Sequence, residues 1–376
     1  MAGIAHYLRT HRQWSIFLEE HELSSPPPSL NTLKGCDGIL SRPTTPALAE
    51  LFRKIKVPVV DLNDLYDDLE LPWVGSDHVG IGRLAANYFL ERGFHSFGYC
   101  GFSQELWASR RRDGFRAAIE ERGFALNVYE TPWHGSKIPL WPLEIERISQ
   151  WLKSAPKPIG VLACNDVRGL HILDACQRSG LNVPDDVAVI GVDNDVILCE
   201  LSNLPLSSVA PDPGRIGYAA SEILDNLMAG KSAPDAKTFI APHGIVTRRS
   251  SDTLAVNDRI VAAALRFIRE QSDHGCKVKD ILKHVRVSRS VLERSFRKHL
   301  KRSPQDEIRV VQIGRVKQLL TETDFKLERI AELSGFKHPE YMNVQFKRIT
   351  GQTPGNYRKQ FGFVKINASN QGEIRR

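Results

Sequence analysis

The sequence predicts an α/β part with parallel sheets, followed by a smaller part built from helices alone. Three observations carry this prediction. Short apolar segments alternate with amphipathic ones between residues 35 and 248, no strand candidate follows residue 250, and positive charge gathers in the last third of the chain. A chain of 376 residues is also too long for one ordinary core, so two or three domains are expected.

The first part contains five short apolar segments with the composition of buried strands: Cys36–Leu40, Val57–Leu62, Phe97–Cys100, Ile159–Cys164 and Val187–Val192. Between them, apolar residues at i, i+3 and i+4 predict four helices: Ile81–Arg92, Arg110–Arg122, Leu143–Lys153 and Arg168–Ser179. Such alternation is typical of parallel sheets covered by helices. We expect this part over residues 1–249, a linker over 250–257, a helical domain over 258–362 and a disordered tail over 363–376.

Charge divides the chain at the same place. Residues 257–362 hold 23 Lys and Arg against 12 Asp and Glu, a net charge of +11, whereas residues 1–256 carry −6. Such asymmetry indicates a nucleic-acid-binding part joined to a part that binds something else, although a solvated basic surface has the same composition.

Several classes of protein are excluded by simple features. The six cysteines form no Cys-x-x-Cys pair and no zinc spacing with histidine, so they are expected to be buried thiols, and no metal or cofactor is predicted. The apolar runs are too short to span a bilayer, and the first 20 residues lack the features of a signal peptide. A cytoplasmic protein with no membrane partner is expected.

The basic part contains a repeat. Residues 286–308 read RVSRSVLERSFRKHLKRSPQDEI, and residues 334–361 read SGFKHPEYMNVQFKRITGQTPGNYRKQF, so that Phe296 corresponds to Phe346 at an interval of 50. In each copy an apolar-faced helix is followed, after a tight turn, by a second helix, which predicts a helix-turn-helix unit. The buried stripes of the second helices are expected to include Val291, Leu292, Ser295 and Phe296 in the first copy, and Met342, Phe346 and Ile349 in the second.

The outward faces of the two second helices carry polar and basic side chains. An α-helix fits the major groove, where its first residues reach base edges while later Lys and Arg meet phosphates. The residues predicted to face DNA are Ser288, Arg289, Ser290, Glu293, Arg294, Arg297, His338, Glu340, Asn343, Lys347 and Arg348. Among them, base contacts are expected from Arg289, Arg294 and Asn343, and phosphate contacts from Arg297, Lys347 and Arg348. A connecting helix over Gln305–Leu320 would hold the two units together.

Residues 258–362 resemble the DNA-binding domain of the AraC family, which carries two helix-turn-helix units. The resemblance rests on FKRITGQTPGNYRKQF, in which Phe346, Lys347, Gly351, Thr353, Pro354, Tyr357 and Arg358 match the family pattern. The first unit departs at Arg286 and Leu282, which stand where the family usually has Gly and Ala. A positive φ at Arg286 would cost roughly 1 kcal/mol. The resemblance implies double-stranded operator DNA as a partner.

Three polar clusters in the first part are expected to meet. VGSDHVGIGRLAANYF leads from a loop into a helix, and VLACNDVRG and VAVIGVDND each end a strand in polar residues. Ligands in open α/β sheets collect at the carboxyl ends of strands, so these clusters predict a binding crevice. Gly80-Ile81-Gly82 superficially fits a dinucleotide fingerprint, but residues 75–78 are too polar for the required strand, and helix packing explains the glycines better.

The order of these segments resembles the sugar-binding domain of the LacI/GalR regulators and the periplasmic binding proteins. LSSVAPDPGRIGYAASEILDNLMAG, residues 206–230, is similar to their Ser-Val strand and the Gly-x-x-Ala helix that crosses between lobes. The resemblance implies a two-lobed domain that closes on a sugar, and it places the sugar contacts at Asp77, Trp107, Arg111, Asn165 and Asp193. Alternatives remain for the polar residues, since Asp77 could cap a helix, Arg111 could be a surface charge, and Asn165 and Asp193 could cap loops.

An AraC-type domain placed after a sugar-binding domain is the order found in regulators of xylose operons. WASRRRDGFRAAI, IGVDND and LSSVA are similar to their segments. This resemblance implies D-xylose as the ligand, a homodimer, and contact with RNA polymerase if the protein is an activator; the residues alone indicate a small polyol. Those proteins begin with a strand before the segment that matches Gly3–Glu19, so we expect an exposed sheet edge and a true start upstream of Met1.

Two other functions are compatible with parts of the sequence. A sugar-active enzyme would need paired carboxylates, for which Asp77 with Asp193 is the candidate pair. A DNA-binding protein that needs no ligand would keep the helical domain alone as its functional part. We expect a regulator rather than an enzyme.

Overall fold

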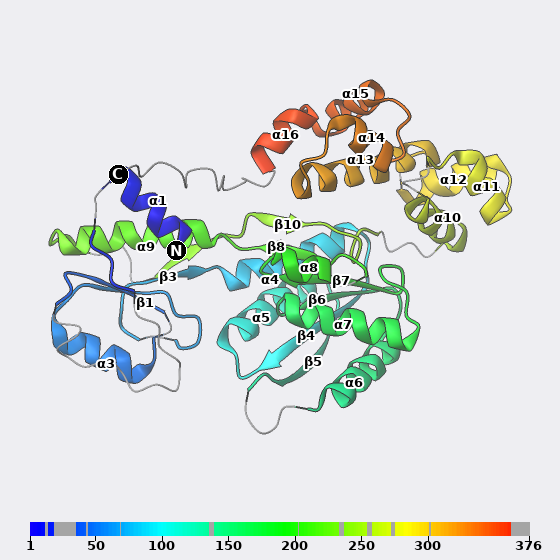
Figure 1. The fold of residues 1–376 in the computed structure, drawn as a ribbon. Helices are drawn as coiled ribbons and strands as arrows, with labels where there is room; N and C mark the ends of the chain where they lie inside the picture. The colour runs from blue at the N-terminus through cyan, green and yellow to red at the C-terminus, as the bar shows by residue number, and fades with distance from the viewer. Residues whose placement is uncertain are drawn as a thin grey trace. The chain divides into compact units, whose positions relative to one another are not determined.

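The chain folds into two compact units, Met1–Ala255 and Val256–Arg376, in a computed structural model (Figure 1). The structure describes residues 1–11, 14–18, 35–42, 44–67, 69–134, 139–201, 203–232, 237–253, 258–271, 275–300 and 302–361. The expected tail and residues 254–257 of the expected linker lie outside these ranges. No helix among the described residues is both long enough and apolar enough to cross a membrane.

The larger sheet of the first unit has six strands in the order β10-β8-β7-β6-β4-β5. β10 runs antiparallel to β8 and the other neighbours are parallel, which confirms the predicted sheet class. β6 and β7 are buried at every residue, as central parallel strands must be. The strands are β4 (Ser96–Ser103), β5 (Leu126–Pro132), β6 (Ile159–Ala163), β7 (Val187–Val192), β8 (Ser207–Ala210) and β10 (Gly244–Val246).

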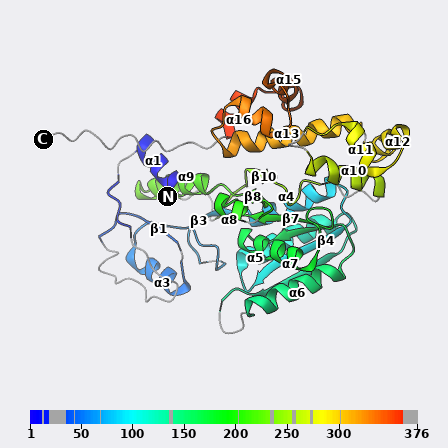
Figure 2. The ribbon, with the colours of Figure 1, turned by 45° about the vertical axis from the view of Figure 1, so that its right-hand side comes forward.

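Helices cover both faces of this sheet (Figure 2). α4 (His78–Glu91) and α5 (Leu106–Glu120) pack on one face, while α6 (Trp141–Ser154), α7 (Asp166–Ser179) and the short α8 (Val196–Leu201) pack on the other. Successive residues of a strand serve opposite faces, so Tyr99 joins the first core and Cys100 the second. Inside the second core, the Arg168 guanidinium lies 2.6 Å from Oε1 of Glu144, and both side chains are buried.

Glycines bring α4 and α5 unusually close together. A Cβ at Gly82 would lie 2.1 Å from the carbonyl oxygen of Arg111, and one at Gly114 would lie 2.2 Å from that of Val79. Only residues without a side chain permit this approach. Gly82 therefore serves helix packing, as expected, whereas a Cβ at Gly80 would meet the carboxylate of Asp77.

The smaller sheet has four parallel strands in the order β1-β2-β3-β9. They are β1 (Ile39–Ser41), β2 (Val59–Asp61), β3 (Trp73–Ser76) and β9 (Lys237–Ile240). α9 (Pro213–Met228) packs on one face through Ala220, Ile223 and Leu224, and α3 (Pro46–Ile55) packs on the other through Phe52 and Ile55. α1 (Ala2–Thr10) packs against α9. β1 is an edge strand, and Ile16, Phe17 and Leu18 are exposed.

The chain passes three times between the small lobe, which holds the four-stranded sheet, and the large lobe, which holds the six-stranded one. The crossings run from β3 to α4, from β8 to α9 and from β9 to β10. The backbone N–H of Asp77 donates to the carbonyl of Ile240 at 2.9 Å, and that of His243 donates to Ala210 at 2.8 Å. The three crossings therefore lie side by side, as in a two-lobed hinge.

The second unit contains only helices among its described residues. The first two helices are α10 (Arg259–Glu270) and α11 (Val278–Val285), and Asp258 caps α10 by accepting hydrogen bonds from the N–H groups of Ile260 and Val261. The connecting helix predicted over Gln305–Leu320 is α13. The remaining helices are α12 (Arg289–Leu300), α13 (Pro304–Glu322), α14 (Leu327–Leu333), α15 (Pro339–Thr350) and α16 (Pro354–Phe361).

Some details differ from the sequence analysis. Residues 75 and 76, which we took as too polar for a strand, belong to β3, and the ring of Trp73 lies where a side chain at Gly75 would stand. Ser250 and Ser251 of the expected linker are buried in the first unit, where Ser250 Oγ donates to the carbonyl of Val189 at 2.7 Å. All six cysteines are free thiols, and all but Cys36 are buried.

Candidate functional sites

Arg111 lies at the centre of the side chains that were predicted to bind a ligand. It is 5% exposed, so it is not the surface charge that the sequence allowed. Its Nη1 donates to the carbonyl of Cys164 at 2.6 Å, its Nη2 donates to Oδ1 of Asp193 at 3.2 Å, and its guanidinium lies 4.9 Å from the centre of the Trp107 ring. One arginine thus joins α5 to the ends of β6 and β7.

His78, which the sequence analysis missed, links Arg111 to the small lobe. Arg111 Nε donates to His78 Nδ1 at 3.3 Å, so the ring carries its hydrogen on Nε2, which lies 3.3 Å from Oδ1 of Asp64. Burial and the charge of Arg111 lower the pKa of His78 and outweigh the opposing effect of Asp64, which favours the neutral ring. A lone histidine at a helix start carries no sequence signal for this role.

Asp64 completes the link between the lobes, because it follows β2 of the small sheet. Its burial raises the pKa of the carboxyl, but the hydrogen bond from His78 and the charges of Arg42 and Arg111 lower it, and the pKa lies below its usual range. We call His78, Trp107, Arg111, Asp193 and Asp64 the interlobe cluster.

Asp77 and Asn165 act as helix caps, the alternative that the sequence left open for Asp77. Asp77 Oδ1 accepts from the N–H of Gly80 at 2.8 Å, and Asn165 Oδ1 accepts from the N–H of Arg168 at 2.9 Å. Each cap directly adjoins a partner of Arg111 in the chain, since Asp77 precedes His78 and Asn165 follows Cys164. The caps therefore fix the backbone from which the interlobe cluster is built.

Asp193 has a backbone conformation that an L-residue rarely adopts. Its φ is +108°, and Asn194 after it has a φ of +49°. Such conformations cost of order 1–3 kcal/mol and persist where neighbours enforce them. Here the N–H of Asp193 donates to the carbonyl of Val209 at 3.0 Å, and Arg248 donates to Oδ1 of Asn194 at 2.9 Å. The turn holds the half-exposed carboxylate of Asp193 against Arg111.

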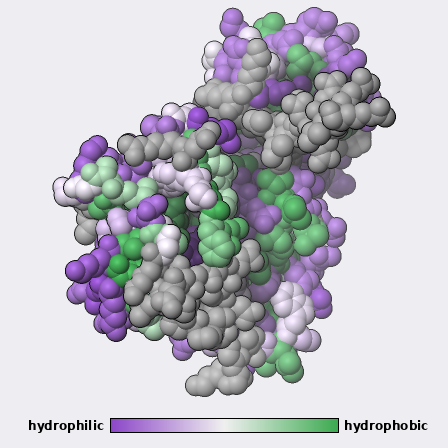
Figure 3. Space-filling view, turned by 60° about the vertical axis from the view of Figure 1, so that its left-hand side comes forward, coloured by the Kyte–Doolittle hydropathy of each residue, from purple (hydrophilic) through white to green (hydrophobic). Residues whose placement is uncertain are grey.

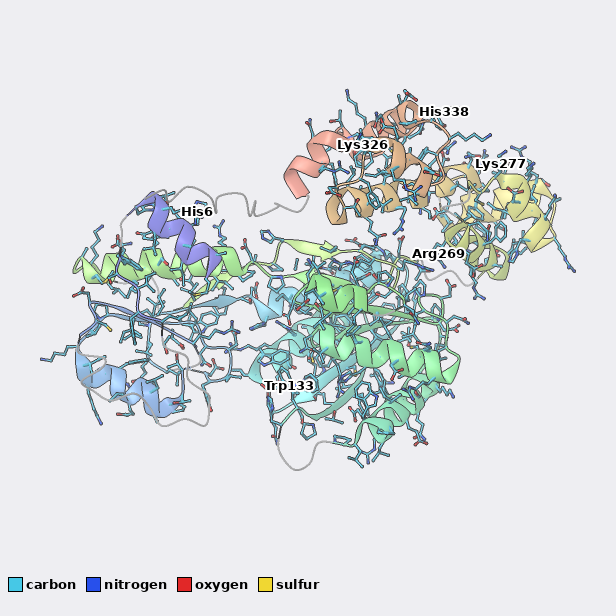
Figure 4. The ribbon with its side chains drawn as sticks, in the orientation of Figure 1. His6, Trp133, Arg269, Lys277, Lys326 and His338 are labelled. Atoms are coloured by element: carbon cyan, nitrogen blue, oxygen red, sulfur yellow. The ribbon has the colours of Figure 1, made fainter. Side chains whose placement is uncertain are left out.

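Aromatic rings adjoin the interlobe cluster. The rings of Trp107 and Trp133 meet edge to face with centroids 5.7 Å apart, and Trp133 stacks on Phe102 at 4.8 Å. Trp133 is 36% exposed and is labelled in Figure 4. Tryptophan rings of this kind can cover the apolar face of a sugar while charged neighbours bond its hydroxyl groups. The sequence analysis identified Trp107 but not Trp133, which follows an edge strand without a motif.

Other features of the first unit offer less. An open cavity of about 520 Å³ is lined by residues of α1 and α9, including His6, Arg215 and Tyr218, and by none of the predicted ligand residues. No group of His, Cys, Asp or Glu within the described ranges could hold a metal ion. The two carboxylates considered as an enzymatic pair have separate structural partners. Asp77 caps α4, and Asp193 accepts a hydrogen bond from Arg111.

The second helices of the two repeats, α12 and α15, have the same pattern of burial. Residues 291–300 and 341–350 repeat it position by position, with Leu292 and Phe296 buried in one copy and Met342 and Phe346 in the other. Among the predicted DNA-facing residues, Glu293 and Asn343 are half-buried at corresponding positions, and the exposed ones are Ser288, Arg289, Ser290, Arg294, Arg297, His338, Glu340, Lys347 and Arg348. Figure 4 labels His338, which precedes α15.

Two residues that we expected in the buried stripes are exposed. Val291 is 38% exposed because it lies to the side of the stripe formed by Leu292 and Phe296. Ile349 is 42% exposed because the core that α15 enters ends at Phe346 in this helix, one turn earlier. Both turns that precede these helices contain a residue with positive φ, +54° at Arg286 and +69° at Gly335.

The connecting helix α13 holds the second turn in place. Gln312 Nε2 donates to the carbonyl of Gly335 at 2.9 Å, and Phe336 is buried beside it. The Arg309 guanidinium lies 4.9 Å from the centre of the Tyr341 ring. The start of α15 is therefore fixed by side chains from α13.

Comparisons with known proteins agree with this division of the chain. A periplasmic binding protein-like domain matches residues 86–251, and a helix-turn-helix domain matches residues 281–360. The xylose operon regulatory protein of Haemophilus influenzae is 29% identical over 95% of this chain and 93% of its own length; that of Escherichia coli K12 is 27% identical over 95% and 92%. The solved structure of a xylose-binding transcription activator, xylR, matches with a TM-score of 0.70 and 26% identity, covering 96% of this chain and 94% of that one.

The chain is a two-domain transcription regulator, homologous to the xylose operon regulatory proteins. The predicted fold class, the AraC-type helix-turn-helix domain and the regulatory function are thereby confirmed. The relatives reported above are named as regulators rather than as enzymes. Its second unit binds DNA through a helix-turn-helix domain.

Proposed function

We propose that the regulator responds to D-xylose bound by the interlobe cluster, with Asp77 and Asn165 as further contacts. The observation that carries the proposal is the position of Arg111, whose three donors meet Cys164, Asp193 and His78, and through His78 reach Asp64 of the small lobe. A pentose offers pairs of hydroxyl groups that carboxylates accept from and Arg or Asn donates to. The names of the relatives support xylose among such sugars.

We further propose how the sugar controls DNA binding. The sugar stabilises one arrangement of the lobes by binding it more tightly than the other, and the coupling is of order 1–3 kcal/mol. Two copies form a homodimer that places the two helical domains, one from each copy, on operator half-sites, and the dimer acts in the cytoplasm as an activator that contacts RNA polymerase. The DNA contacts are those predicted on α12 and α15, with Arg294 among the base contacts and Arg297 among the phosphate contacts.

Thermal denaturation of the full chain with a panel of pentoses and hexoses tests the effector. Xylose at 100 times its dissociation constant should add about 2.7 kcal/mol to the stability of the first unit. The other sugars at the same concentration serve as controls. If the melting temperature rises with a different sugar alone, that sugar is the effector in place of xylose. A folded chain whose melting temperature responds to no sugar would contradict a sugar effector.

The coupling to DNA is tested separately, by measuring operator affinity with and without the sugar that shifts the melting temperature. The proposal expects a change of roughly 5- to 150-fold. Sedimentation with and without operator tests the dimer. A sugar that binds but leaves operator affinity unchanged would contradict the proposed control while leaving the effector intact.

A further inference from the structure

We call α12 and α15 the recognition helices. In each of them, one residue near the middle lies on the side opposite the buried core. Residues in an α-helix follow each other at about 100°. Val344 stands two residues after the buried Met342 and two before the buried Phe346, so it lies about 180° from the middle of the buried stripe. Arg294 has the same relation to Leu292 and Phe296. These are the two most outward positions of α15 and α12.

The chemistry at these positions differs between the copies. Arg294 is an exposed charge, whereas Val344 is an exposed hydrocarbon, with 62% of its surface open to solvent. Beside it, Tyr341 is 44% exposed and stands where the first copy has Val291. The pairs that follow are alike, Arg297 with Lys298 and Lys347 with Arg348. The helices therefore share basic ends suited to phosphates and differ in their centres.

Tyr341 is held in place from behind. Its ring contacts the Arg309 guanidinium of α13 and lies 6.3 Å from the ring of Phe336, edge to face. Val344 follows one turn later on the same side of the helix. The two side chains form an exposed apolar strip between the polar residues at the start of α15 and the basic pair near its end.

We infer that Val344, with Tyr341 beside it, reads thymine in the major groove through the thymine 5-methyl group. Apolar side chains distinguish thymine by contact with this methyl, whereas Arg pairs with the O6 and N7 acceptors of guanine. The two helix-turn-helix units of one chain therefore read different stretches of DNA, with a guanine preference opposite Arg294 and a thymine preference opposite Val344. The inference concerns the reading of DNA and does not depend on the proposed effector.

An ordinary exposed valine is the competing explanation. Single hydrophobic residues are common on protein surfaces, and Figure 3 shows hydrophobic residues among hydrophilic ones on the visible surface of the second unit. Position distinguishes the two explanations, because Val344 occupies the centre of the face that the helix presents to DNA. The experiment must therefore detect one methyl group at one base.

The test is a uracil interference experiment with the full chain. Fragments that the wild-type chain selects from a random DNA pool are remade with uracil at a fraction of the thymines, and bound and unbound fragments are compared at each position. Uracil lacks only the 5-methyl group. We expect uracil at one or two thymines within the stretch that α15 reads to weaken binding roughly four-fold, the loss that corresponds to one methyl group leaving an apolar contact.

Variants assign the effect to its residue. Val344→Ala should bind the same fragments more weakly and lose the difference between thymine and uracil at those positions, while Val344→Arg should select guanine there. Val310→Ala removes a 37% exposed valine from α13 and should keep the wild-type pattern. The inference is wrong if uracil is tolerated at every thymine, or if Val344→Ala retains the wild-type interference. Failure to select any sequence would instead contradict specific DNA binding itself.

Discussion

Replacing Arg111 with methionine tests the centre of the interlobe cluster. The substitution keeps an apolar side chain beside Trp107 and removes the donors to Cys164, His78 and Asp193. A buried acceptor left without its donor costs about 1–3 kcal/mol, so the Cys164 carbonyl and His78 Nδ1 together predict a loss of roughly 2–6 kcal/mol. The pair with Asp193 adds little, because that carboxylate is half exposed.

Urea denaturation of the full chain measures the loss of stability, and isothermal titration with xylose measures binding. Arg83→Met is the matched control, because Arg83 pairs with Glu121 on the surface, with the two side chains 44% and 59% exposed. The control should change the free energy of unfolding by less than about 1 kcal/mol and should bind sugar as the wild type does. Arg111→Met should not bind sugar.

Asp193→Asn is a second variant that tests sugar binding even if Arg111→Met does not fold. It removes only the charge of a half-exposed side chain, so the fold should persist while xylose affinity falls by roughly ten-fold, the equivalent of about 1.4 kcal/mol. The reasoning fails if Arg111→Met is destabilised by less than about 1 kcal/mol and binds xylose normally, or if Asp193→Asn leaves sugar affinity unchanged.

Three further predictions concern other parts of the chain. Glu144→Ala leaves the buried Arg168 without its carboxylate and should cost about 3–5 kcal/mol in urea denaturation. Burial raises the pKa of Asp166 to about 7, so the folded chain keeps a proton that the unfolded chain releases near pH 4; stability should fall as pH rises from about 4 to 7, and Asp166→Asn should flatten this dependence. Arg297→Ala should lower the salt slope of operator binding by about 1 without changing the preferred sequence.

For each of these three predictions, one outcome would contradict the reasoning. A loss below about 1 kcal/mol for Glu144→Ala would mean that the charge of Arg168 is compensated by other groups. An unchanged pH profile in Asp166→Asn would assign the slope to other carboxyls. A shifted sequence preference in Arg297→Ala would make that residue a base contact rather than a phosphate contact.

The sequence predicted best those elements whose burial is uniform or whose caps are explicit. β6 and β7 are continuous apolar runs because both faces of the strand are covered. The connecting helix predicted over Gln305–Leu320 lies inside α13, whose start is fixed by the cap at Ser303 and by Pro304. β5, Leu126–Pro132, was missed because it is an edge strand whose residues are mostly half-exposed, which removes the apolar run. β3 was missed because it contains a glycine, Gly75, which interrupts the apolar run. The ring of Trp73 fills the space that a side chain at Gly75 would occupy.

Some residues of the interlobe cluster could be predicted from the sequence and others could not. Arg111 and Asp193 were predicted through a resemblance and the rule that polar residues gather at the ends of strands, and the structure brings them together. His78 and Asp64 could not be predicted, because their contact joins residues 14 positions apart in different lobes and neither belongs to a motif. On α12 and α15, periodicity gave the buried stripes of Leu292 with Phe296 and of Met342 with Phe346. It did not give the width of the stripe or the point where the core ends, which is why Val291 and Ile349 were misplaced.

The three neighbouring crossings between the lobes limit the motions open to the sensor. A single connection would let one lobe swivel in any direction, whereas three strands bonded side by side, through Asp77 with Ile240 and His243 with Ala210, resist twisting and sliding alike. What remains is bending about one axis near these strands. If bending about this axis is the one motion that costs little energy, binding of a ligand changes a single quantity, the angle between the lobes. Any small molecule that changes this angle by the same amount should therefore have the same effect on the rest of the protein.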